Sequence, residues 1–177
     1  QIEILSATGR AAVTGQLKKQ LQTLQALPKP LIAVTDLLSQ GKLVKAEQLC
    51  KAFMQKVPRH IEGMRLLADI GSRLGVLEDA EFLLESAIEF SPENIQVRID
   101  YIQVLRKRQK NESALAQAKI LLAKDPKNPQ FQSVFAVESM QSGDYDTALE
   151  TFDSILATLP EDPVTLTSRG HALKTRG

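Results

Sequence analysis

The sequence predicts an all-α protein in which pairs of antiparallel helices stack into a superhelical array. The first observation is composition: the 177 residues contain no Trp and 5% aromatic residues, and Leu, Ala, Gln and Lys are common, which favours helices over strands. The second is a repeat of residue types every 34 positions. The third is helical spacing of apolar residues inside each unit, as at Leu67, Ile70 and Leu74.

The repeat is visible in four columns that share one register. The columns contain Pro58, Pro92, Pro126 and Pro160; Ala46, Ala80, Ala114 and Ala148; Gly41, Gly75, Gly143 and Gly177, with Gln109 at the remaining position; and Phe53, Ala87, Leu121 and Ile155. Four columns in one register do not arise by chance, so we expect one structural unit to recur along the chain.

Each column has a physical place in a unit of helix, turn, helix and turn. Glycine accepts the positive φ of a helix C-terminus, so the Gly column marks the turn inside the unit. Where Gln109 replaces glycine, we expect the nearby Asn111 to take the left-handed conformation. The Ala column places a small side chain early in the second helix, where two helix axes approach. The Pro column ends the second helix, because proline lacks an N–H group.

Helix starts are marked as clearly as helix ends. Asn128-Pro129 and Asp162-Pro163 each join a capping residue to a proline at the first helical position. Taken in order along the chain, the signals predict helices over 29–40, 44–57, 61–74, 78–90, 95–108, 112–124, 129–142, 146–158 and 163–176.

Residues 1–27 lie outside the register of the repeat. Leu17, Leu21, Leu24 and Leu27 form one stripe, which predicts an amphipathic helix over about 12–27. We expect this helix to cap the first unit, because the ends of repeat arrays need covering. The alternatives are that it lies in the groove of the array or pairs with another chain.

The stretches LLADIGSRLGVLEDAEFLLESAIEFSPEN (66–94) and SMQSGDYDTALETFDSILATLPED (139–162) resemble tetratricopeptide repeats (TPRs). The resemblance implies a right-handed TPR α-solenoid of four full repeats and part of a fifth. In the family's small-residue column of the first helix, Val34 and Ile102 are larger than usual, so we expect two slightly splayed interfaces. The expected divisions are an N-terminal extension over 1–27, repeats over 28–60, 61–94, 95–128 and 129–162, and a truncated fifth repeat over 163–177.

No arrangement of residues predicts catalysis, a cofactor or a metal. His60 falls in a turn between repeats and is expected to be solvated, and Cys50 lies on a core face as a small buried hydrophobe. No glycine-rich phosphate loop occurs. We therefore expect this chain not to be an enzyme and to hold no cofactor or metal.

Charge and cysteine content narrow the partners and the compartment. A formal net charge of +1 argues against nucleic acid and anionic membranes as partners. No apolar run approaches the ~18 residues of a membrane span. A single cysteine excludes an internal disulfide and favours a reducing compartment, so we expect a cytoplasmic protein.

The remaining way to act is through a surface. In TPR proteins the first helices of the repeats line a concave side, and that side usually holds a peptide or a partner helix. The resemblance thus implies a scaffold for protein–protein interaction, with a basic groove centre that favours an acidic peptide. The alternative is an assembly module that self-associates through the N-terminal helix and the repeat ends into a homo-oligomer. The candidate groove residues are Arg65, Asp69, Arg73, Gln103, Arg106, Lys107, Gln141 and His171.

A narrower resemblance lies at the end of the chain. The stretch GHALKT (170–175) resembles the last repeats of a bacterial group in which an N-terminal TPR array is fused to a sulfotransferase domain. It implies that the chain is the non-catalytic N-terminal part of a larger protein, with the catalytic domain following residue 177. His171 and Lys174 share one face of the last predicted helix, where they could face the groove.

Overall fold

The computed structural model describes residues 27–177, and within this range it is all-α. Every helix end lies within one residue of the position expected from the sequence. The expected helix over 12–27 lies outside the described residues, apart from Leu27. The helices are α2 (Lys29–Ser39), α3 (Leu43–Lys56), α4 (Ile61–Leu74), α5 (Leu77–Phe90), α6 (Ile95–Lys107), α7 (Asn111–Lys124), α8 (Pro129–Gln141), α9 (Tyr145–Thr158) and α10 (Pro163–Arg176).

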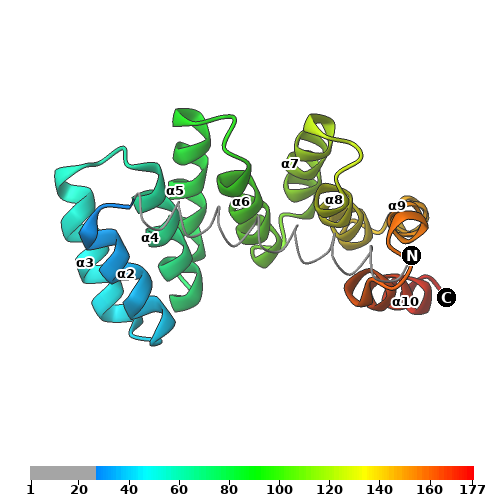
Figure 1. Cartoon of the computed structure of the whole chain (residues 1–177), viewed down its shortest axis with the longest axis horizontal. Coiled ribbons are helices and arrows are strands. Elements are labelled where there is room, and N and C mark those ends of the chain that lie inside the picture. The colour runs from blue at the N-terminus through cyan, green and yellow to red at the C-terminus, as the bar shows by residue number, and fades with distance from the viewer. Residues whose placement is uncertain (1–26) are drawn as a thin grey trace, which may run out of the picture.

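The helices follow one another along the array from α2 at one end to α10 at the other (Figure 1). Each helix packs mainly on its neighbours in the chain, as α4 does on α5 and α8 on α9. The first helices of successive units also touch, as α4 does on both sides, with α2 and with α6. The fold is therefore a stack of helix pairs in which contacts are local, the arrangement expected of a solenoid.

The alanine column lets the two helices of each unit approach closely. Ala46, Ala80, Ala114 and Ala148 are all fully buried. A Cβ atom placed on Gly71 of α4 would lie 3.7 Å from the Cβ of Ala80 on α5, which is ordinary van der Waals contact. Because these alanines are fully buried, a larger side chain at any of them would have to displace its neighbours, as the sequence indicated.

Three turns inside the units use glycine, and the fourth does not. Gly41, Gly75 and Gly143 have φ angles of 71°, 84° and 86°. At the fourth turn Gln109 itself takes the left-handed conformation, with φ at 59°, so the expectation that Asn111 would do so was wrong. Asn111 instead begins α7. The turn keeps the length of the others, so the chain must reverse at the same position whichever residue occupies it.

The second correction concerns His60, which was expected to be solvated. Its side chain is half-buried and caps α4, with Nδ1 accepting a hydrogen bond from the Gly63 N–H at 3.2 Å. Its ring meets the Phe53 ring edge-on, with 5.1 Å between centroids. Asn94, Asn128 and Asp162 cap α6, α8 and α10 in the ordinary way.

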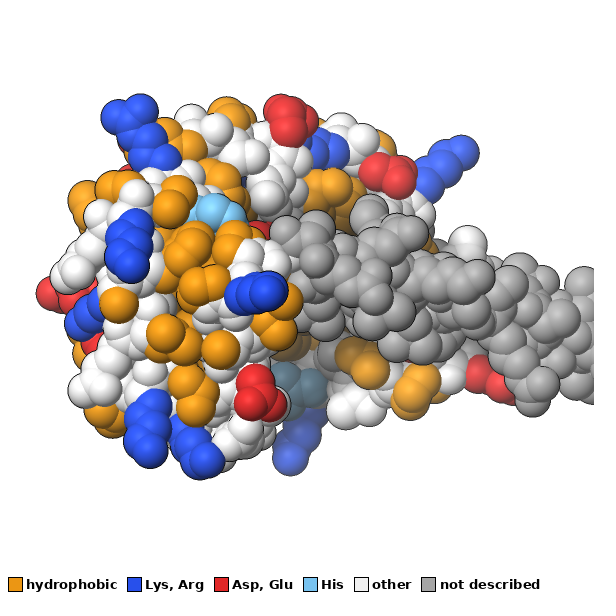
Figure 2. All heavy atoms as spheres, turned by 60° about the vertical axis from the view of Figure 1, so that its left-hand side comes forward, with side chains coloured by type: hydrophobic (Ala, Val, Ile, Leu, Met, Phe, Trp, Pro, Cys, Tyr) orange, Lys and Arg blue, Asp and Glu red, His pale blue; other side chains and the backbone are white. Residues whose placement is uncertain are grey.

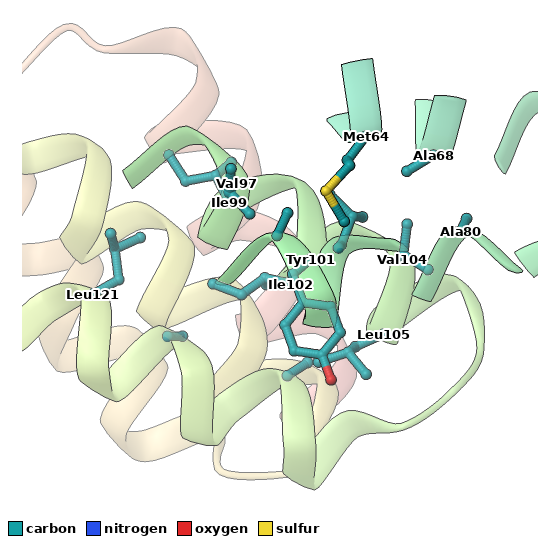
Figure 3. Packing of buried hydrophobic residues seen from close by; sticks show 14 of the residues in the cluster. Met64, Ala68, Ala80, Val97, Ile99, Tyr101, Ile102, Val104, Leu105 and Leu121 are labelled. Carbon is teal, nitrogen blue, oxygen red and sulfur yellow. The ribbon is translucent and has the colours of Figure 1, made fainter. Parts of the chain in front are cut away.

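The apolar core is divided among the units. The middle cluster joins α4, α5, α6 and α7 and reaches α8 through Phe131, and Figure 3 shows Met64, Ala80 and Leu121 around the residues of α6. A second cluster lies between α2, α3 and α4, and a third between α8, α9 and α10. Cys50 is fully buried in the second cluster, as expected. The helices that carry Val34 and Ile102 pack less extensively on their partners, α2 on α3 and α6 on α7, than α4 does on α5 or α8 on α9, which agrees with the expected splaying.

Apolar side chains are exposed at both ends of the described array. At the first end, hydrophobic side chains gather on the face formed by α2 and α3 (Figure 2), where Ile32 and Val44 are exposed. At the other end, α10 exposes Val164, Leu166 and Leu173. Inside the array the corresponding surfaces are covered by the next unit, so both ends offer apolar area for a further contact.

Candidate functional site

A cavity of about 240 Å³ lies between α4 and α6, on the side formed by the first helices. Its polar residues come from both helices, and its apolar residues are Leu66, Leu84 and Val104. It brings together four of the eight candidate groove residues. The lining consists of Arg65, Leu66, Asp69, Ser72, Leu84, Asp100, Gln103, Val104 and Lys107.

Arg65 connects the two walls of this cavity. Its Nε donates to Asp100 Oδ2 on α6 at 2.7 Å, and its Nη1 donates to Glu62 on α4 at 2.7 Å. The other oxygen of Asp100 accepts from Gln96 Nε2 at 2.9 Å. Burial alone would lower the pKa of Arg65, but the charges of Asp100 and Glu62 outweigh it and raise the pKa. Arg65 is therefore a fixed cross-link between α4 and α6.

Lys107 makes the second connection across the cavity. Its Nζ donates to Ser72 Oγ on α4 at 2.6 Å. The two cross-links, Arg65–Asp100 and Ser72–Lys107, are about two helical turns apart along α4 and α6, and all four residues line the cavity. They hold the walls in one position, so the cavity is a preformed feature of the array.

The basic centre expected from the sequence is largely compensated by carboxylates. Arg73 pairs with Asp69 at 2.9 Å and Arg106 pairs with Glu138 at 3.2 Å, while Arg65 is held as described above. Among residues 27–177, Lys107 makes no ion pair with a carboxylate. Of the four expected basic residues, Lys107 is therefore the one whose charge could pair with an acidic group of a bound partner.

The other candidate residues lie away from this cavity. Arg73 is on the exposed side of α4, and Arg106 is on α6 facing α8. Gln141 lines a separate hollow at the end of α8. His171 is exposed on α10, in the last unit. The eight predicted residues therefore form one compact group of four and four dispersed positions.

Sequence reasoning missed two of the carboxylates that hold the arginines, Asp100 and Glu138. The signal that could have found one of them is the period of the repeat. Arg65 and Asp100 are 35 residues apart, as are Ser72 and Lys107, so both pairs occupy matching places on neighbouring first helices. Searching for opposite charges at about one repeat of separation would have predicted the first pair.

A second set of ion pairs joins the same two units on the other side. Arg108, just after α6, pairs with Glu78 at 2.9 Å and also with Glu81, and Lys110 pairs with Glu81 at 2.7 Å. Burial would raise the pKa of Glu81, but the hydrogen bonds from Lys110 and Arg108 outweigh it and lower the pKa. The second and third units are thus linked by charged groups on both sides.

Two features are absent from the part of the chain that the structure describes: a metal-binding group and a helix that could span a membrane. No group of His, Cys, Asp or Glu among residues 27–177 is arranged to hold a metal ion. In the same range, no helix combines the length and apolar character needed to cross a membrane.

The comparisons with known proteins agree with this architecture. A tetratricopeptide repeat protein from Parabacteroides merdae ATCC 43184 superposes with a TM-score of 0.74 at 24% identity, over 88% of this chain and 61% of that one. MamA from Desulfovibrio magneticus RS-1, from residue 41 to its end, gives 0.72 at 14% identity, over 83% and 84%. These likenesses establish the fold alone. A comparison with curated proteins gives no match.

The family is established by the sequence itself. Residues 16–165 match the model of the cytochrome c-type biogenesis protein H TPR domain, which spans most of the chain. The match includes the units that form the cavity and its cross-links. The chain therefore belongs to the family of the cytochrome c-type biogenesis protein H TPR domain.

Proposed function

We propose that this chain is a protein-interaction scaffold that binds a peptide or partner helix in the groove where α4 and α6 meet. The observation that supports it is the cavity of about 240 Å³ with apolar residues at Leu66, Leu84 and Val104 and a polar rim. An apolar pocket with a few convergent polar groups is the usual form of a binding site. A segment with one apolar side chain for the cavity and polar neighbours for the rim fits this surface.

We infer the charge of the partner from the basic groove side chains that do not already pair with a carboxylate of this chain. Arg65, Arg73 and Arg106 are paired with carboxylates, so Lys107 is the group that supports an acidic partner. A ligand carboxylate could replace Ser72 as its hydrogen-bond acceptor and form a charge-assisted bond. One acidic residue beside an apolar one is therefore the peptide pattern that we propose.

An array of short peptides tests this function. The peptides should vary in the number of acidic residues and in the size of one apolar side chain, and sequences of c-type cytochromes belong in the array because of the family's name. We expect Lys107→Glu to weaken binding of acidic peptides. Lys119→Glu, at an exposed position on α7, is the matched control and should keep it. Equal binding by both variants would rule out the α4–α6 groove as the site.

The scaffold proposal includes a place in a larger protein and in the cell. We propose that the chain is a non-catalytic part of a longer protein, with a sulfotransferase as the enzyme implied by GHALKT, and that it works in the cytoplasm. Reading the gene beyond the codon for Gly177 tests the first statement. Fractionation of cells that express the tagged full-length protein tests the second.

A second candidate function is self-association through the ends of the array. The supporting observation is the exposed apolar area at Ile32 and Val44 on one end and at Leu166 and Leu173 on the other. Light scattering over a range of concentrations would detect an oligomer. If the ends associate, Val44→Lys should yield the monomer, and Phe82→Lys should not, although Phe82 is 68% exposed on the side of the array. A monomer at every concentration would exclude this candidate.

A further inference from the structure

The outward side of α5 exposes a phenylalanine on a negatively charged helix. The first helices of successive units mostly touch one another, and no two second helices do so to the same degree, so α3, α5, α7 and α9 form the wider, outer side of the array. On this side Phe82 is 68% exposed, more than any other large hydrophobic side chain among residues 27–177. The helix that carries it contains no Lys or Arg, and its acidic residues are Glu78, Asp79, Glu81, Glu85 and Glu89.

Two of these carboxylates lie beside Phe82 and have no cation of their own. Residues three and seven positions apart share one face of a helix, so Glu85 and Glu89 follow Phe82 along the outer side of α5. Both are exposed. At the start of the helix, in contrast, Arg108 pairs with Glu78. Glu85 and Glu89 form no ion pair within residues 27–177, so their charges are available to a bound partner.

These carboxylates are unfavourable for the helix that carries them. Glu81, Glu85 and Glu89 are each four residues apart, and like charges at this spacing repel. Glu89 also lies in the last turn of α5, which contains no basic residue, and the helix dipole disfavours a negative charge there. The positions of α7 that match Glu85 and Glu89 carry Lys119 and Ala123 instead. A locally unfavourable choice that no contact of the fold offsets is typical of a functional site.

The same helix already holds a cation on another phenylalanine. The guanidinium carbon of Arg59 lies 5.2 Å from the centre of the Phe90 ring, at the end of α5. This is the distance of a cation–π contact. Phe82 presents the same ring with more exposed area, and no Arg or Lys within residues 27–177 lies over it. A cation from another molecule can therefore reach Phe82 as Arg59 reaches Phe90.

The charge of this face selects among the partners that an exposed aromatic ring could have. Phosphates of nucleic acids and anionic lipids are negative, so Glu85 and Glu89 would repel them. A basic protein segment suits both features of the surface. The planar guanidinium of arginine stacks on aromatic rings and forms paired hydrogen bonds with carboxylates.

We propose that the outer face of α5 is a second docking surface, which binds a basic segment of a partner protein. An arginine of that segment lies over the Phe82 ring, and its other cations pair with Glu85 and Glu89. The preferred charge is opposite to that of the α4–α6 groove, and the surface belongs to the second helix of its unit rather than the first. The array therefore holds a basic partner on its outer side whether or not the groove is occupied.

Fluorescence anisotropy with two labelled synthetic peptides tests this surface on the full chain. In the first peptide, arginines recur at helical spacing among alanines and leucines, and the second peptide has glutamine at each arginine. We expect the arginine peptide to bind about tenfold more tightly than the glutamine peptide, because only the first can form the ion pairs. An acidic peptide added in excess should not displace it, which separates this surface from the α4–α6 groove.

Two variants remove the proposed contacts without changing the core. Phe82→Leu keeps an apolar side chain but removes the ring, and it should weaken binding of the arginine peptide about fivefold. The double variant Glu85→Gln and Glu89→Gln should weaken it about tenfold and reduce its dependence on salt. The double variant should also unfold at a higher temperature, because the repulsion along α5 is removed. Glu150→Gln, an exposed carboxylate of α9 at the position that matches Phe82, is the control and should leave binding unchanged.

Several results would overturn the proposal. Equal binding of the two peptides, or native affinity in both variants, would exclude the outer face of α5 as a site for a basic segment. Equal weakening by Glu150→Gln would assign the binding to the overall charge of the outer side. Anionic lipid vesicles that bind the chain, and bind it less after Phe82→Leu, would replace the partner protein with a membrane. A labelled copy of the chain that behaves in the same way would replace it with a second copy.

Discussion

The guanidinium of Arg65 on α4 reaches the carboxylate of Asp100 on α6, with Nε 2.7 Å from Oδ2. Both side chains are mostly shielded from solvent, at 21% and 25% exposure, and Glu62 and Gln96 hold them from the opposite sides. A local ion pair would stabilise one helix, but this one joins two structural units. It sets the distance between the walls of the candidate groove.

The strength of this cross-link can be measured with a double-mutant cycle. We expect a coupling of about 1 kcal/mol between Arg65→Ala and Asp100→Ala in the free energy of unfolding, because the pair is partly shielded from water. The Glu47–Lys51 pair within α3 is more exposed and is the control, with a coupling of roughly 0.4 kcal/mol. Denaturant titration of the four chains of each cycle gives both values. A coupling no larger than that of the control would contradict a role in joining the units.

The turn at Gln109 should be improved by glycine. Gln109 has φ at 59°, where a Cβ atom is crowded, so Gln109→Gly should raise the free energy of unfolding by about 1 kcal/mol. Gly75→Ala, at φ 84°, is the reverse change at the matching turn and should lower it by a similar amount, about 1 kcal/mol. Thermal unfolding followed by circular dichroism measures both. A loss of stability in Gln109→Gly would show that the glutamine side chain has a stabilising contact.

The alanine column should not tolerate a large side chain. Ala80 is fully buried against Gly71, so Ala80→Leu should cost roughly 3 kcal/mol through overpacking. Ala116→Leu, on the exposed side of α7, should change stability by less than about 0.5 kcal/mol. Equal effects in a denaturant titration would mean that α4 and α5 can move apart without cost.

Glu138 should make stability depend on pH in a particular direction. Burial raises the pKa of Glu138, and the charge of Arg106 offsets this only in part. A carboxyl group whose pKa is raised by folding stabilises the folded chain while it is protonated, and this contribution is lost as the pH rises through the folded-state pKa. The difference in unfolding free energy between the native chain and Glu138→Gln should therefore fall as the pH rises above the ordinary glutamate range. A constant difference between pH 4 and 8 would show that Glu138 is not destabilised by its burial.

Cys50 should be inert to thiol reagents while the chain is folded. It is fully buried, its Sγ donates to the Gly63 carbonyl at 3.4 Å, and burial raises its pKa to about 11. The thiolate is the reactive form, so modification at pH 8 should require opening of the fold. The rate should rise when denaturant is added. Rapid modification of the folded chain would show that α3 opens easily near Cys50.

The helices could be predicted closely because their boundaries depend on neighbouring residues in the chain. Glycines at Gly41, Gly75 and Gly143, prolines after the second helices, and caps such as Asn128 act within one turn of the helix end. The turn at Gln109 was predicted less well, because propensity favours Asn111 for a left-handed conformation whereas the length of the turn selects Gln109. The fixed position of the turn in the repeat therefore decided which residue takes the left-handed conformation, and the intrinsic preference of asparagine did not.

The candidate site was harder to predict because it depends on contacts between units. The sequence identified Arg65, Asp69, Gln103 and Lys107, which meet at the cavity, but it could not give the partners that neutralise the arginines. His60 was missed as a cap because the bond from Gly63 depends on the orientation of its ring. Glu138 was not identified from the sequence, because its burial and its ion pair with Arg106 depend on the packing of α8 against α6.

The continuity of apolar packing at α8 also bears on how the protein loses its structure. In an array whose units contact only their neighbours, cooperative unfolding requires strong junctions throughout. The middle apolar cluster extends from α4 into α8 through Phe131, and α7 packs on α8 as extensively as α5 does on α6. Denaturant should therefore unfold α2–α10 in a single transition.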